Sequence, residues 1–235
     1  CMRLPFYRGE VGSWKGERGV AGSGPRKHLR RPEALGLTRR ALTRCLALGA
    51  TAFGRASPRT LGLVSRCDME LFHLVVLVAA ALCALVAGLL FTFAVIAMPG
   101  LRNLSDREFI RAFQVMDRVI QERQPLFMLV WVGSVVVLVL ALAMGFQQQD
   151  GVIRGLLIAA AALYLLGVQL PTALVHLPLN NEIQTVKVEA IGEAEQRQAR
   201  ERFEARWNRS NRIRTAIAVV TMVLLLLVLI RLSAA

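Results

Sequence analysis

The stretch Val223-Leu-Leu-Leu-Leu-Val-Leu-Ile230 is apolar on every side, and Val135-Val-Val-Leu-Val-Leu140 has the same character. A helix without a polar face offers nothing for water to solvate, so it is buried in a large core or in a membrane. Both stretches belong to longer segments that contain no Asp, Glu, Lys or Arg. These charge-free segments are Leu71–Leu101, Gln124–Gln149, Gly155–Asn181 and Thr215–Ile230.

The lengths of these segments predict membrane spans. A helix needs about 20 apolar residues to cross the hydrocarbon layer, and the first three segments have that length. The fourth is shorter, but Arg214 and Arg231 flank it and can extend their side chains to the two interfaces. We therefore expect an all-α fold, a four-helix transmembrane bundle in residues 69–235 that contacts the lipid bilayer and has amphipathic or polar helical connections. The spans are expected at about residues 71–98, 125–146, 155–178 and 214–231.

The basic charge of the chain is concentrated before the first span. Of the net charge of +13, most comes from residues 1–68, which hold 14 Lys and Arg against 4 Asp and Glu. This segment shows no alternation of aromatic and basic residues, so we expect a disordered, solvated arm and no nucleic-acid partner. Two interpretations stay open. Either Met69 is the true start and the upstream residues are a leader or a fragment, or they form a targeting segment, because Thr38-Arg39-Arg40 resembles a twin-arginine signal.

The connections between spans differ in charge, and this difference predicts an orientation. Segment 102–123 has five Lys and Arg, segment 182–214 has eight, and segment 147–154 has one. Basic connections remain in the cytoplasm. The expected location is a bacterial inner membrane, with loops 102–124 and 179–213 on the cytoplasmic side.

Two of the connections are predicted to be helical. Ser105 and Glu108 form a capping-box pattern, and an apolar stripe follows that would lie on the membrane surface or against the bundle. The stripe consists of Phe109, Phe113, Met116 and Ile120. In the third connection Ala199, Phe203 and Trp207 share one helical face. Within the spans, small residues predict close contacts between helices. They are Ala80, Ala84 and Gly88 in the first span and Ala159, Ala160 and Gly167 in the third.

Polar residues gather at the junction of the third and fourth spans. Gln169, Thr172, His176 and Asn180 recur at i, i+3, i+7 and i+11 and so share one face, which Pro171 loosens by freeing a carbonyl group. Polar groups at this depth cost free energy unless they are paired or used. Each also has a structural interpretation, as a helix cap, a headgroup anchor or an interfacial aromatic. The candidate catalytic residues are His176 and Arg214, and the candidate substrate-binding residues are Gln169, Thr172, Asn180, Asn181, Trp207 and Asn211. Neither the cysteines nor the histidines have metal-ligand spacing, so no metal is expected.

Several motifs near these positions resemble a known family. They are Gly88-Leu-Leu-Phe-Thr-Phe-Ala94, Met98-Pro99, Gln124-Pro125-Leu-Phe127, Pro178-Leu-Asn180-Asn181 and Trp207-Asn208-Arg-Ser-Asn211-Arg-Ile-Arg214-Thr215. Together they resemble the small four-span membrane proteins that include the fungal anthrone oxygenases, over about residues 71–231. The resemblance implies a compact four-helix bundle and, as in the fungal members, oxidation of an anthrone by oxygen without a recognised organic cofactor or metal. The matched positions are Asn180, Asn181, Trp207, Asn211 and Arg214.

Two functional hypotheses follow. In the first, the protein is a cofactor-independent oxygenase that acts on a hydrophobic, enolisable small molecule: His176 removes a proton, Arg214, Asn180 and Asn211 hold the resulting oxyanion, and Trp207 packs on the ring. In the alternative, the protein is a non-enzymatic membrane module, either a small-molecule binder or an accessory subunit. A transporter is less favoured because no inverted repeat is apparent.

Overall fold

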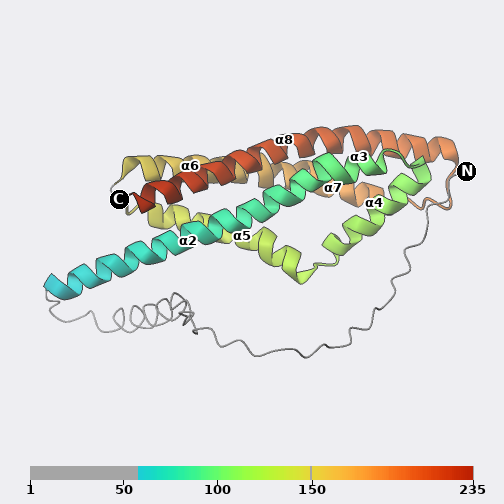
Figure 1. Cartoon of the computed structure of the whole chain (residues 1–235). Coiled ribbons are helices and arrows are strands. Elements are labelled where there is room, and N and C mark those ends of the chain that lie inside the picture. Colours follow the sequence, from blue (N-terminus) through green and yellow to red (C-terminus); the bar gives the residue numbers. More distant parts are fainter. Residues whose placement is uncertain (1–57, 149, 235) are drawn as a thin grey trace, which may run out of the picture. The chain divides into compact units, whose positions relative to one another are not determined.

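The computed structural model describes residues 58–148 and 150–234 of the chain, with side chains from residue 68 (Figure 1). This part of the chain consists of helices and short connections. The elements are α2 (Pro58–Thr92), η1 (Phe93–Ala97), α3 (Met98–Leu101), α4 (Asp106–Gln121), α5 (Pro125–Gly145), α6 (Gly151–Tyr164), η2 (Leu165–Gln169), η3 (Thr172–His176), α7 (Leu177–Thr185) and α8 (Glu193–Ser233).

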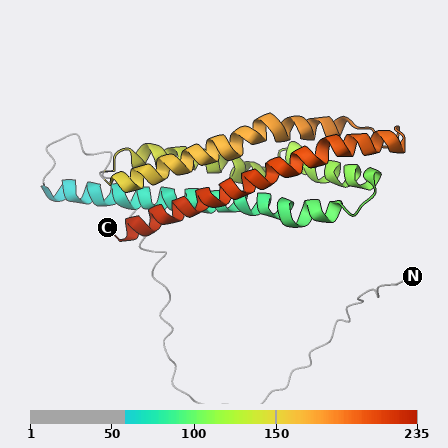
Figure 2. The same cartoon turned by 90° about the horizontal axis from the view of Figure 1, so that it is seen from above.

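Four helical runs are long and apolar enough to cross a membrane, and they lie side by side (Figure 1 and Figure 2). They are Asp68–Leu101, Pro125–Gly145, Gly151–Thr185 and Glu193–Ser233. The predicted all-α four-helix bundle is confirmed, and the chain is an integral membrane protein. Helix α2 begins at Pro58, earlier than the predicted start of the first span at residue 71. The rest of the predicted basic leader, residues 1–57, lies outside the described residues.

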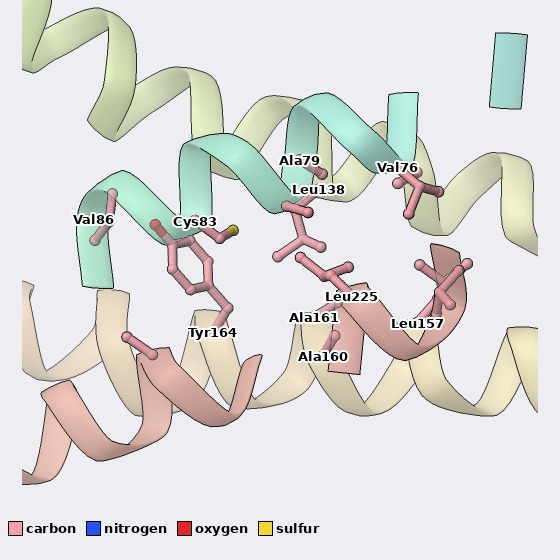
Figure 3. Packing of buried hydrophobic residues seen from close by; sticks show 14 of the residues in the cluster. Val76, Ala79, Cys83, Val86, Leu138, Leu157, Ala160, Ala161, Tyr164 and Leu225 are labelled. Carbon is pink, nitrogen blue, oxygen red and sulfur yellow. The ribbon is translucent and has the colours of Figure 1, made fainter. Parts of the chain in front are cut away.

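The core of the bundle combines small and large side chains from α2, α5, α6 and α8. Figure 3 shows Tyr164 extending toward the face of α2 that carries Ala79, Cys83 and Val86. The Tyr164 hydroxyl forms a 2.6 Å hydrogen bond with Ser134 Oγ of α5, which satisfies both buried groups. Of the small residues predicted to mark contacts, Gly88 is exposed and its Cβ position has no atom within 4 Å, so it marks no contact.

The three π-helical segments each end two residues before a proline. Segment η1 precedes Pro99, η2 precedes Pro171 and η3 precedes Pro178. The ring of a proline in a helix collides with the carbonyl of the fourth residue before it, and here that residue is the middle one of each π segment. The wider π turn relieves this collision, so the prolines account for the places where these helices depart from α geometry.

One end of the bundle extends beyond the apolar spans. We call it the polar end; it consists of α4, α7 and residues 193–214 of α8. The predicted capping box of Ser105 and Glu108 starts α4, and the Ser105 hydroxyl accepts a hydrogen bond from the Glu108 amide. The helix packs against the bundle through Phe109 and Phe113, whose rings contact Phe203 of α8 edge-on. Helix α8 has 41 residues and a length of about 60 Å, so it serves as both the third connection and the fourth span.

Candidate functional site

A cavity of about 300 Å³ lies at the polar end, where α2, η1, α4, α5, η3, α7 and α8 meet. Its walls are mainly apolar and aromatic, with a few polar groups, which is typical of sites for small hydrophobic molecules. The aromatic lining consists of Phe93, Phe113, Phe127, Trp131 and Trp207. The polar lining consists of Asp117, Gln121, Thr172, His176, Asn180 and Arg214.

The third membrane helix supplies one polar wall of this cavity. Thr172, His176 and Asn180 are four residues apart, so they follow one another along a single helical face. The predicted stripe is therefore present from Thr172 onward. Gln169 belongs to the same stripe by spacing but does not line the cavity, and its buried Nε2 has no hydrogen-bond partner.

The His176 side chain is held between two residues of α8. It is only 2% exposed, its Nε2 lies 2.9 Å from Ser210 Oγ, and its ring meets the Trp207 ring edge-on at 4.9 Å between centroids. The other ring nitrogen, Nδ1, is buried and has no partner. When Nε2–H donates to Ser210, Nδ1 keeps a lone pair that can accept a proton.

Arg214 is buried on the same side of the cavity and is held by neutral groups. Its Nη1 donates to Thr172 Oγ1 at 2.8 Å and its Nη2 to Asn211 Oδ1 at 2.9 Å, whereas its buried Nε has no partner. Among the residues with described side chains, no carboxylate lies within ion-pair distance of this guanidinium. Its positive charge is therefore available to an anionic group of a bound molecule.

Asn211 fixes Arg214 and does not line the cavity. Besides accepting from Arg214, its Nδ2 donates to the Leu90 carbonyl at 3.1 Å, and it is 1% exposed. The carbonyl is that of the third residue before η1, a stretch in which the helix changes geometry. Asn211 thus joins α8 to α2 and holds the guanidinium in place.

Asn180 forms hydrogen bonds with two other residues of the cavity lining, whereas its neighbour Asn181 does not line the cavity. The Trp207 indole donates to Asn180 Oδ1 at 3.0 Å, and Asn180 Nδ2 donates to Asp117 Oδ1 at 2.7 Å. Asn181 is exposed and only its side-chain oxygen approaches Gln121, at 3.5 Å. Five predicted residues therefore meet at the cavity: Thr172, His176, Asn180, Trp207 and Arg214.

The comparison with family models bears on this site. Residues 115–224 match the model of the anthrone oxygenase family. This match confirms the resemblance to that family. It contains all eight candidate residues, so the part of the chain that is similar to anthrone oxygenases is the part that forms most of the cavity. The comparisons with curated proteins and with solved structures found no match.

The anthrone oxygenase-like region also holds a cavity residue that the sequence analysis missed. Asp117 of α4 is 3% exposed and accepts hydrogen bonds from three amide groups. The donors are Asn180 at 2.7 Å, Gln184 at 2.9 Å and Gln121 at 2.6 Å. The sequence does contain a signal for Asp117. Phe109, Phe113 and Asp117 are four residues apart, so the carboxylate lies on the same helix face as the two aromatic rings. The predicted stripe passes instead through Met116 and Ile120, which are half-buried.

The polar residues of the anthrone oxygenase-like region act as hydrogen-bonding groups toward the cavity. Within residues 68–148 and 150–234, no group of three or more His, Cys, Asp or Glu is arranged to hold a metal ion. The cavity offers a bound molecule flat aromatic walls and the polar side chains of its lining. Two atoms of these polar side chains, His176 Nδ1 and Arg214 Nε, are buried without a hydrogen-bond partner.

Proposed function

We propose that the cavity binds a flat, hydrophobic, enolisable molecule from the membrane and that the protein oxidises it with molecular oxygen, without an organic cofactor or metal. One observation carries the proposal: two buried polar atoms of cavity-lining residues, His176 Nδ1 and Arg214 Nε, have no partner. Buried polar atoms are nearly always hydrogen-bonded. A substrate with an acidic C–H group and a carbonyl oxygen would provide a proton for the first atom and an acceptor for the second.

The chemistry assigns a role to each group. His176 Nδ1 removes the C–H proton, and Arg214, with Asn180 at the other end of the wall, stabilises the negative charge that develops on the carbonyl oxygen. The enolate gives one electron to O₂, and the two radicals combine into a peroxide that takes the proton back from His176. Loss of water then leaves a ketone, so that a CH₂ group and O₂ become a carbonyl group and H₂O. Trp207 packs against the rings of the substrate.

The roles of the other predicted residues follow from their positions. Thr172 accepts from Nη1 of Arg214 and Asn211 accepts from Nη2, so both residues orient the guanidinium. Gln169 and Asn181 do not line the cavity, so in this proposal they do not touch the substrate.

Oxygen uptake tests the proposal. The full chain is purified in a mild detergent and mixed with an anthrone, and the uptake is compared with the uncatalysed rate. We expect His176→Gln to lower the rate by about 10²- to 10⁴-fold, as for the loss of a general base. His73→Gln is the matched control, because His73 lies in the first part of α2 and outside the cavity. Wild-type uptake no faster than the uncatalysed reaction, or full activity of the His176 variant, would refute the proposal.

A second candidate is a non-enzymatic binder or accessory subunit. It is favoured by the hydrogen bonds through which Asn180 and Asn211 tie α7 to α4 and α8 to α2. In that case Asn180→Ala lowers the yield of folded protein in detergent, and no substrate-dependent effect accompanies the loss. Measuring yield and oxygen uptake on the same preparation separates the two functions.

We also propose that the polar end faces the cytoplasm of a bacterial inner membrane. The support is the charge of the connections, since the two segments at this end hold five and eight basic residues and the connection at the other end holds one. In this orientation the cavity lies at the depth of the inner leaflet, where a substrate dissolved in the membrane can reach it.

A further inference from the structure

A second concave surface lies at the polar end, between α8 and the η1–α3 segment. It is a groove of about 1050 Å³ that shares no lining residue with the cavity described above. Its lining combines small residues, Ala94 and Ala205, with three arginines, Arg102, Arg209 and Arg212. We call it the arginine groove.

The arginine groove carries an excess of positive charge. Arg102, Arg209 and Arg212 are exposed, and within the described side chains none of them has a carboxylate at ion-pair distance. The lining also contains two acids. Glu204 is already paired with Arg200 at 2.8 Å, so Glu201 is the one remaining acid of the lining. Such a surface favours an anion, and guanidinium groups suit phosphate oxygens because they donate two parallel hydrogen bonds.

The same face of α8 becomes apolar directly beyond the arginines. Arg209, Arg212, Ala216, Val219 and Val223 are spaced by three or four residues, so they form one stripe along the helix. Val219 and Val223 are 38% and 44% exposed in the bundle, as expected for side chains that contact lipid. Within one helix face, the stripe therefore passes from basic side chains, which suit a phosphate group, to apolar side chains, which suit a hydrocarbon chain.

We propose that the arginine groove binds an anionic glycerophospholipid. Its phosphate lies between Arg102 and the pair Arg209 and Arg212, and one acyl chain follows Ala216, Val219 and Val223. A lipid with a trimethylammonium headgroup is disfavoured because the groove offers that cation only Glu201. The proposal does not depend on the oxidation proposed above, since the two sites have separate linings.

Native mass spectrometry of the full chain in a neutral detergent tests this site. Phosphatidylglycerol, phosphatidylcholine and soluble glycerol phosphate are added separately, and the bound fraction is measured. We expect phosphatidylglycerol to be retained at least tenfold better than phosphatidylcholine. Replacing Arg102, Arg209 and Arg212 together by Gln should lower its binding on the order of tenfold to a hundredfold, given the attraction of each arginine near an anionic headgroup.

Two further variants control for charge and folding. Replacing Arg118, Arg123 and Arg202 by Gln removes the same charge from exposed positions outside the groove, and binding should stay within about twofold of wild type. Replacing the three groove arginines by Lys keeps the charge but removes the two parallel hydrogen bonds of each guanidinium, so binding should lie between that of wild type and that of the Gln variant. Equal binding of the two lipids, or wild-type binding by the Gln variant, would overturn the proposal. Competition by soluble glycerol phosphate as strong as that by phosphatidylglycerol would show a site for a free phosphate and would also overturn it.

Discussion

Asp117 shows how a single side chain is stabilised inside an otherwise apolar helix face. A buried carboxylate loses several kcal/mol of hydration, which its surroundings must replace. Here the replacement comes from three amide groups, two of them on α7. Gln114 of α4 adds hydrogen bonds to the backbone carbonyls of Ile183 and Val186 at the end of α7. The carboxylate thus acts as a polar clamp, by which we mean that its hydrogen bonds hold α4, the amphipathic connection, against α7 at the end of the third membrane helix.

Removing this clamp should be costly. Asp117→Ala leaves the amide of Asn180 without its acceptor and removes one of the two acceptors of the Gln184 amide, which keeps the Gln114 carbonyl. We expect a loss of about 2–5 kcal/mol in the free energy of unfolding. Chemical unfolding of the purified protein in detergent measures it. Glu182→Ala is the control, because that carboxylate is exposed on α7, and its effect should stay within about 0.5 kcal/mol. Equal stability of the two variants would show that the clamp contributes nothing.

At the scale of elements, helix α8 packs closely against η2 at Gly167. A Cβ atom built on this glycine would lie 2.7 Å from Ile217 Cγ2 and 2.8 Å from Ile217 Cδ1, distances that real Cβ atoms do not adopt. Because Ile217 is β-branched and stiff at χ1, it cannot move aside easily. The prediction that Gly167 permits a close helix contact is therefore confirmed.

Enlarging Gly167 should separate these helices. We expect Gly167→Ala to lower the free energy of unfolding by about 1–3 kcal/mol through overpacking. Gly155→Ala in α6 is the matched control, since its Cβ would meet nothing within 4 Å and the change should be neutral or stabilising by up to about 1 kcal/mol. Thermal unfolding of the two variants side by side gives the comparison. A stabilised Gly167 variant would contradict the assigned contact.

An ion pair joins the N-terminal end of α6 to the C-terminal end of α8, and it makes the stability of the protein depend on pH. Arg231 Nε donates to Asp150 Oδ2 at 3.0 Å, and Asp150 also caps α6 by accepting from the Val152 amide at 2.8 Å. The Arg231 hydrogen bond, followed by the backbone hydrogen bonds, holds the pKa of Asp150 below its usual value. A group whose pKa is lower in the folded state than in the unfolded state stabilises the fold at pH values above the unfolded-state pKa. This stabilisation is lost as the pH falls through the folded-state pKa.

The expected consequence is a pH-dependent difference between wild type and Asp150→Asn. Wild type should unfold at the higher temperature at pH 7, and the difference should shrink as the pH falls below about 4, near the unfolded aspartate pKa. Thermal unfolding at several pH values and fixed salt measures it. An Arg154→Gln variant, which alters a nearby exposed charge outside this pair, should not change the pH at which the difference disappears. A constant difference down to pH 2 would show that the Asp150 charge has no role.

How far the sequence predicts these elements depends on whether a signal is local. Runs without charge are sufficient for four membrane helices, and the spacing of Thr172, His176 and Asn180 is sufficient for one wall of the cavity. The position of Asp117 is not predicted, because α4 has two overlapping apolar stripes and only the packing against Phe203 selects the one that contains it. The predicted contact at Gly88 is wrong for a related reason. A small residue permits a close helix contact, but the sequence does not show which face of the helix is turned inward.

At the scale of the whole molecule, the two concave surfaces lie on the same end of the bundle. The cavity is enclosed by α2, η1, α4, α5, η3, α7 and α8, and the arginine groove lies between the η1–α3 segment and α8. Residues 207–214 of α8 contribute to both, with Trp207 and Arg214 on one side and Arg209 and Arg212 on the other. A substrate held by Arg214 and a lipid phosphate held by Arg212 would therefore lie at similar depths in the membrane.

Because both concave surfaces lie at one end of the bundle, the orientation of the chain decides which leaflet they face. Two single-cysteine variants, one at each end, test this orientation. In a background where Cys1, Cys45, Cys67 and Cys83 are replaced, Arg118→Cys marks the polar end and Gln147→Cys marks the connection between α5 and α6. Both positions are exposed. Because basic connections are retained in the cytoplasm, we expect a membrane-impermeant maleimide to label Gln147→Cys in intact spheroplasts and Arg118→Cys only after permeabilisation. The reverse pattern would place the cavity in the outer leaflet, so that its substrate would enter from the opposite side of the membrane.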